Sequence, residues 1–94
     1  MVIGPEKAEV LALQALAWLA GNEELLPVFL GTTGAAPGNL REAASDPSFL
    51  AAVLDFLLLD DAWVCAFCDS AGLAYDAPLS ARQQLPGGAA VNWT

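Results

Sequence analysis

Histidine is absent from this 94-residue chain, and positive charge is scarce: three lysines and arginines stand against eleven aspartates and glutamates. The missing histidine removes the commonest proton carrier of general acid–base catalysis, and no other catalytic constellation stands out. The net charge of −8 repels phosphate backbones and anionic lipid headgroups, and Lys7, Arg41 and Arg82 form no cluster. We therefore expect neither nucleic acid nor a membrane surface as a partner, and the sequence offers no support for an enzyme.

Long apolar runs are also missing, and we expect the N-terminal segment to be a helix and not an export signal. No uncharged apolar run reaches the roughly 20 residues that span a bilayer. The stretch LALQALAWLAG at 11–21 imitates the apolar part of a signal peptide. However, Glu6 and Glu9 make the region before it net negative, where an export signal is positive. We expect a cytoplasmic protein.

Cysteine is limited to Cys65 and Cys68, three positions apart. This spacing is compatible with a redox pair or half of a metal site, because positions three apart share a helix face and thiolates bind zinc. A four-ligand site would require a dimer, since the chain has no second pair and no histidine. A redox pair typically opens a helix after a strand, where the helix dipole lowers a thiol pKa. Because this pair falls within a predicted helix, we interpret both thiols as core residues.

Carboxylates are plentiful, and Asp55, Asp60 and Asp61 lie close together in the sequence. A hard cation needs several oxygens that converge from a shaped loop, whereas these residues fall on a predicted helix and its break. Helix capping and solvation explain them, so we expect no bound metal and no cofactor.

Apolar residues dominate the composition. They make up 56% of the chain, and charged residues only 15%, against about 25% in typical domains. A chain of this length has little interior in which to bury them. We therefore expect an exposed apolar patch that contacts a protein partner or a second copy. The alternative is that small alanines account for the percentage and leave no patch.

The densest apolar segment, residues 46–73, predicts two consecutive helices. Asp46 fits an N-cap, and Pro47 fits the first helical position, where its missing N–H costs nothing. Asp60 and Asp61 are poor helix-interior residues but good caps, so we place a hinge between the two helices there.

The N-terminal segment predicts a helix over residues 5–20, with Pro5 at its first position. Its apolar residues form one face, and a further group broadens it toward a second: Leu11, Ala15, Trp18 and Leu19, then Val10, Leu13 and Ala17.

The whole pattern predicts an all-α fold, a compact bundle of about five short helices in one domain, 1–94. The helices are expected roughly at 5–20, 22–31, 37–44, 46–59 and 61–72, with a short helical piece at 80–85. Beyond Gly72 most residues are polar or small, and apolar residues occur among them at intervals. We expect this part to form an irregular C-terminal tail packed on the bundle.

Three tryptophans are candidate interaction or tail-anchor residues: Trp18, Trp63 and Trp93. Each indole offers a large apolar surface with one polar N–H, which suits contact sites. Trp93, one residue from the end, either docks on its own domain or reaches into a neighbour.

Four stretches carry a family resemblance: LQALAWLA, DPSFLAAVLDFLLLDD, AFCDSAGL, and LPGG followed by a terminal WT. Together they resemble domain-of-unknown-function family 3572, an uncharacterised bacterial family found mainly in alphaproteobacteria. The resemblance implies a small cytoplasmic bacterial protein whose LPGG and terminal tryptophan belong to the domain. It assigns no catalytic or ligand residue.

These observations favour a protein–protein interaction or adaptor module that acts on a protein partner or as a homodimer. A thiol-dependent redox or metal-handling protein that uses Cys65 and Cys68 is the alternative. A small-molecule-binding bundle is a third hypothesis, which requires a pocket.

Overall fold

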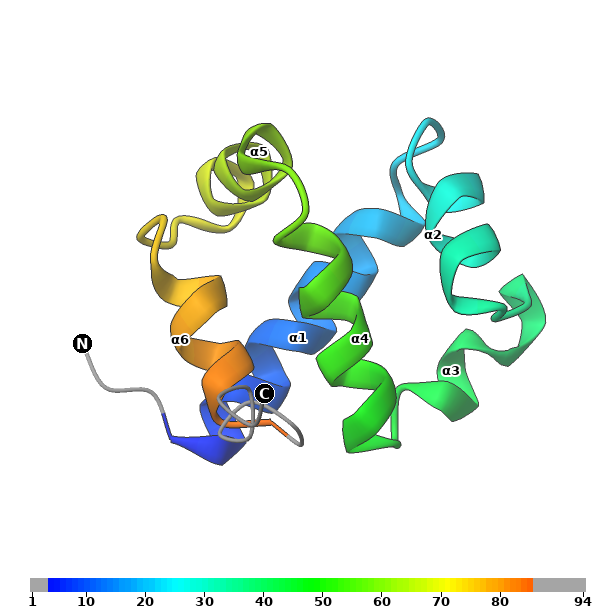
Figure 1. The fold of residues 1–94 in the computed structure, drawn as a ribbon, viewed down its shortest axis with the longest axis horizontal. Helices are drawn as coiled ribbons and strands as arrows, with labels where there is room; N and C mark the ends of the chain where they lie inside the picture. Colours follow the sequence, from blue (N-terminus) through cyan, green and yellow to red (C-terminus); the bar gives the residue numbers. More distant parts are fainter. Residues whose placement is uncertain (1–3, 86–94) are drawn as a thin grey trace, which may run out of the picture.

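Helices fill the part of the chain that the computed structural model describes, residues 4–85 (Figure 1). They are α1 (Pro5–Ala20), α2 (Leu26–Thr33), the 3-10 helix η1 (Pro37–Asn39), α3 (Leu40–Ala43), α4 (Pro47–Leu57), α5 (Asp61–Ala71) and α6 (Ala77–Gln83). No strand occurs in these residues, and the expected all-α fold is confirmed. α1 and α4 cross at the centre of the molecule, with α5 and α6 on one side and α2 and α3 on the other (Figure 1).

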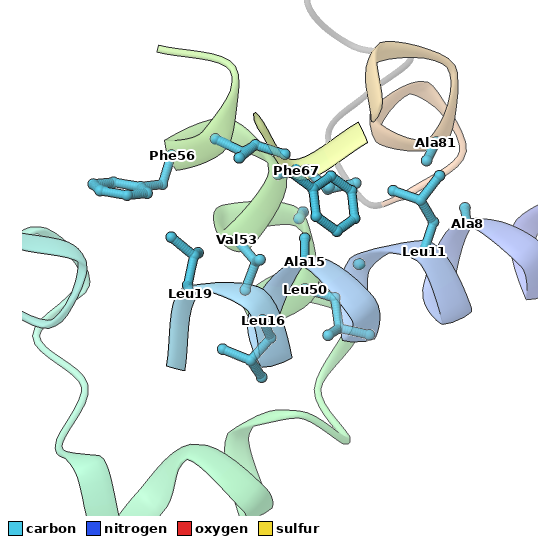
Figure 2. Packing of buried hydrophobic residues seen from close by; sticks show 14 of the residues in the cluster. Ala8, Leu11, Ala15, Leu16, Leu19, Leu50, Val53, Phe56, Phe67 and Ala81 are labelled. Atoms are coloured by element: carbon cyan, nitrogen blue, oxygen red, sulfur yellow. The ribbon is translucent and has the colours of Figure 1, made fainter. Parts of the chain in front are cut away.

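One face of α1 packs against α4 and α6. Its buried residues recur every three or four positions: Ala8, Leu11, Ala12, Ala15, Leu16 and Leu19. Half of them are alanines, whose small side chains let the neighbouring helices lie close. Leu11 lies toward Ala81 of α6, and Leu19 lies toward Val53 of α4 (Figure 2).

α4 is the most deeply buried helix, apolar over most of its circumference. Its buried residues are Leu50, Ala51, Val53, Leu54, Phe56 and Leu57. Asp46 caps its first turn by accepting the Ser48 N–H at 2.9 Å. Asp55 is exposed and forms an ion pair with Arg82 of α6 at 2.6 Å. A buried helix thus keeps one polar contact, which joins it to α6.

The hinge between α4 and α5 forms around Asp60. The side chain of Asp60 accepts the Ala62 N–H at 2.8 Å and starts α5 at Asp61. α4 already ends at Leu57, two residues before the expected 59, because Leu58 and Leu59 form a turn. Leu59 is therefore 71% exposed.

α2 and α3 differ most from the predicted helices 22–31 and 37–44. Asn22 accepts the N–H groups of Glu24 and Leu25, each at 3.1 Å, and this turn precedes α2. Pro27 then occupies the first helical turn, where it is tolerated. The third segment begins as η1, which contains the poor helix former Gly38, and only four residues continue as α3.

The first part of the expected tail is helical. α6 starts at Ala77, three residues before the predicted 80–85, because Pro78 suits a first turn. It buries Ala77, Pro78 and Ala81, and Leu85 beyond it is 4% exposed. The remainder of the tail, with Trp93, lies outside the described residues.

Candidate functional site

A groove of about 580 Å³ lies between the first half of α1, the loop after α5 and the start of α6. We call it the α1–α6 groove. Its lining residues are Lys7, Val10, Leu11, Gln14, Gly72, Leu73, Ala74, Asp76, Ala77 and Ser80. The volume falls within the range of about 300–1,000 Å³ that is typical of ligand pockets. The third sequence hypothesis, a small-molecule site, thereby gains the pocket that it requires.

Two local features shape the groove. On α1, its lining residues recur at helical spacing, so they face the same side. On the opposite wall, Gly72 ends α5 in the left-handed conformation with φ 70°, which a glycine adopts without strain. The Leu73 N–H donates to the Cys68 carbonyl at 2.9 Å, and the Leu73 side chain packs on the core. A short turn thus places an apolar wall opposite α1.

Four polar side chains line the groove. Lys7 and Asp76 carry opposite charges, and Gln14 and Ser80 supply neutral hydrogen-bonding groups. Leu11 is buried beneath the groove, whereas Val10 remains 55% exposed on its rim. The surface available to a ligand is therefore apolar with charge at its edges.

The two cysteines are free thiols on α5. Cys65 is half-buried, whereas Cys68 is fully buried and donates its S–H to the Ala74 carbonyl at 3.4 Å. Burial raises the pKa of the Cys68 thiol, and the nearby Cys65, Asp69 and Asp76 add to the rise. A buried, protonated thiol is a poor nucleophile, which favours a packing role for Cys68.

The acidic residues of the described chain do not gather into a metal site. No group of three or more cysteine, aspartate or glutamate side chains that could hold an ion occurs within residues 4–85. Asp55 instead pairs with Arg82, and Asp60 caps α5. Both carboxylates therefore have structural partners.

The two described tryptophans are both half-buried and pack against the core. Trp63 stacks on Phe56 with ring centroids 4.9 Å apart. Trp18 is half-buried and meets Phe67 edge-on at 6.0 Å. It also lines a second hollow of about 590 Å³ at the end of α1, which we call the α1–α2 hollow: Ala17, Trp18, Gly21, Asn22, Glu23 and Glu24. Trp93 lies outside the described residues.

A family model described as protein of unknown function (DUF3572) matches residues 5–88. The chain belongs to this family. The resemblance inferred from the sequence is thus confirmed, and every residue of the groove and the hollow lies within the matched range. Neither a curated protein nor a solved structure matches the chain.

Sequence reasoning missed the groove of this DUF3572 chain, although one signal pointed toward it. Val10 broadens the apolar surface of the first helix, lines the groove and is 55% exposed in the structure. The opposite wall depends on how the turn at Gly72 directs α6, which helical spacing alone does not specify.

Within residues 4–85, no helix has both the length and the apolar character needed to cross a membrane.

Proposed function

We propose that this DUF3572 chain is a cytoplasmic protein-interaction module that binds an apolar segment of a partner protein in the α1–α6 groove. The observation that carries the proposal is an open apolar groove on a strongly acidic domain. Val10 is exposed on the rim of the groove. Leu11 lies beneath the groove, and Leu73 lies on the wall opposite α1. Exposed apolar surface of this kind typically marks a contact site. Two free thiols suit the reducing conditions of the cytoplasm.

Charge favours a basic partner over a second copy. A second copy brings another −8, and the two net charges repel. A segment with lysine or arginine beside its apolar residues is attracted instead, and electrostatic attraction speeds its association. An amphipathic helix fits, because a groove along a helix accepts apolar residues at i, i+3, i+4 and i+7. The same charge argument disfavours nucleic acid.

Designed helical peptides test this proposal. One peptide carries leucine at i, i+3, i+4 and i+7 with lysine at the polar positions, and the other replaces each lysine with glutamate. We expect the lysine peptide to bind the native protein, measured by fluorescence anisotropy, and the glutamate peptide to bind at least about tenfold more weakly.

A matched pair of variants locates the binding site. Val10→Gln removes an apolar contact in the groove, whereas Val28→Gln makes the same change on α2, where the valine is similarly exposed, at 50% against 55%. Losing one buried valine contact weakens binding about tenfold. We expect this loss for Val10→Gln only. Equal effects of the two variants, or equal binding of both peptides, would contradict the proposal.

The thiol-dependent redox or metal-handling role is the second candidate. Its support is that Cys65, which is only half-buried, lies three positions before Cys68 on α5. Thiol titration of the native protein separates the two candidates. The interaction module predicts that Cys68 reacts with a chromogenic disulfide only after denaturation, and Cys65→Ala shows which thiol reacts first. Rapid reaction of both thiols in the native protein would favour the redox candidate.

A further inference from the structure

The residues that α1 and its C-cap contribute to the α1–α6 groove and to the α1–α2 hollow follow one another along one side of the helix. They succeed one another at spacings of three and four, which places them on one side of a helix. We call this set of residues the α1 strip: Lys7, Val10, Leu11 and Gln14 in the groove, then Ala17, Trp18 and Gly21 in the hollow. At a rise of 1.5 Å per residue, the strip is about 21 Å long. The two concavities thus lie end to end along one side of α1.

The far end of the strip has a fixed aromatic ring beside two carboxylates. The Trp18 ring meets Phe67 edge-on at 6.0 Å, so one part of the indole is held while another part lines the hollow. Glu23 and Glu24 line the same hollow and are exposed. Asn22 holds the turn that carries them by accepting the Glu24 N–H at 3.1 Å.

Charge is distributed unequally along the strip. Lys7 lies at the groove end, whereas Glu23 and Glu24 lie at the hollow end. Asp76 adds a negative charge on the opposite wall of the groove. A partner helix in this strip therefore meets one positive and one negative charge at the groove end and two negative charges at the hollow end. This polarity distinguishes the two directions in which such a helix can lie.

We infer that the α1 strip binds one amphipathic helix of a partner protein in a fixed direction, with a lysine or arginine of that helix in the α1–α2 hollow. The cationic side chain lies against the Trp18 ring and between the carboxylates of Glu23 and Glu24, where cation–π and charge attraction act together. The end of the partner helix that carries no basic residue lies beside Lys7. This inference rests on the proposed function and adds the length, direction and anchor of the partner.

A charge-matched pair of variants tests the anchor. Glu23→Gln/Glu24→Gln removes two charges from the hollow. Glu9→Gln/Glu42→Gln removes two charges from exposed glutamates outside the strip, so the net charge changes equally. With the lysine peptide as the probe, we expect the hollow variant to bind about tenfold more weakly and the control variant about twofold more weakly. Equal losses in the two variants would overturn the inference.

Direction is tested with two peptides of the same apolar pattern, cross-linked into a helix to equalise their helicity. One carries its lysines only in the N-terminal turn, and the other carries them only in the C-terminal turn. We expect at least about fivefold preference for one of them, and we expect the preference to disappear in Glu23→Gln/Glu24→Gln. Equal binding of both peptides to the native protein would overturn the fixed direction.

The outcomes separate this inference from the proposed function. If Val10→Gln weakens binding but the two charge variants behave alike, the groove binds a partner and the anchor in the hollow is wrong. If the lysine peptide does not bind at all, the proposed function fails. Light scattering that shows a dimer whose formation Val10→Gln abolishes would overturn both, since a second copy would then occupy the strip.

Discussion

The two sides of the α1–α4 centre differ in how much of the interior they contribute. On one side, α5 and α6 bury several residues: Val64, Phe67, Cys68, Ala77, Pro78 and Ala81. On the other side, α2 buries only Phe29, and α3 buries none of its residues. Both sides lie against the same central pair (Figure 1). Outside the central pair, the buried residues are therefore concentrated on the α5–α6 side, where the groove also lies.

Aromatic contacts attach the α2–α3 side to the centre. Phe29 meets Phe49 at 5.9 Å and Phe56 at 5.3 Å, both in edge-on geometry. Since segments with few buried contacts open locally at lower free energy, α2 and α3 are expected to open before α1 and α4. The α1 strip spans both regions: its groove end lies on the firmly packed side, and its hollow end lies where α2 begins.

Truncating one leucine at the centre and one on the α2–α3 side is the strongest test of this difference. Leu54 of α4 is fully buried, whereas Leu40 of α3 is only partly buried. We expect Leu54→Ala to lower the free energy of unfolding by about 3 kcal/mol and Leu40→Ala by about 1 kcal/mol. Urea denaturation followed by circular dichroism measures both. Equal losses would mean that the α2–α3 side contributes as much stability as the centre.

Two glycine substitutions test the difference between the two sides through smaller changes in stability, which are expected to have opposite signs. Gly72 has φ 70°, so Gly72→Ala strains the turn after α5 and costs about 1 kcal/mol. Gly31 lies inside α2 with open space around it, so Gly31→Ala stabilises the helix by about 0.5–1 kcal/mol. Thermal unfolding of both variants gives the signs. A destabilising Gly31→Ala would indicate that α2 packs more tightly than its burial suggests.

Features fixed by local chemistry were predictable from the sequence. Asp46 and Asp60 cap helices through hydrogen bonds to residues two positions on, and Gly72 adopts the left-handed conformation that ends α5. Such devices act within a few residues, so residue type and order suffice to recognise them.

The remaining features were not predictable from the sequence, because local signals competed with one another or because the feature depends on packing between distant residues. Ser80 was the expected start of the last helix, but Pro78 and the chain direction set by Gly72 allow a start at Ala77. A helix was expected from residue 22, yet Asn22 stabilises a turn before α2. The groove depends on α1 and α6 meeting across more than 60 positions of sequence, and no spacing rule within one helix specifies that.

The smallest expected effect is a pH dependence of stability that arises from the Cys68 thiol on the α5–α6 side. Burial raises the pKa of the Cys68 thiol above its ordinary value of 9.0. As the pH rises past that value, the unfolded chain releases this proton while the folded chain retains it. The unfolded state then binds fewer protons, so the free energy of unfolding falls as the pH rises further. Below the ordinary value, the full stability is present.

Tyr75 acts in the same direction and must be separated from Cys68. Its hydroxyl donates to Asp69 at 2.7 Å, and this bond raises the pKa of Tyr75 above 10.0. In a Tyr75→Phe background, we expect urea denaturation between pH 8 and 10 to show stability that declines with pH. Adding Cys68→Ala should flatten that decline, whatever its effect on the absolute free energy of unfolding. Adding Cys65→Ala should leave the decline with pH in place. If Cys68→Ala leaves the decline of stability with pH unchanged, the α5–α6 side does not shield this thiol from water. Cys68 would then no longer support the view that this side is more firmly packed than the α2–α3 side.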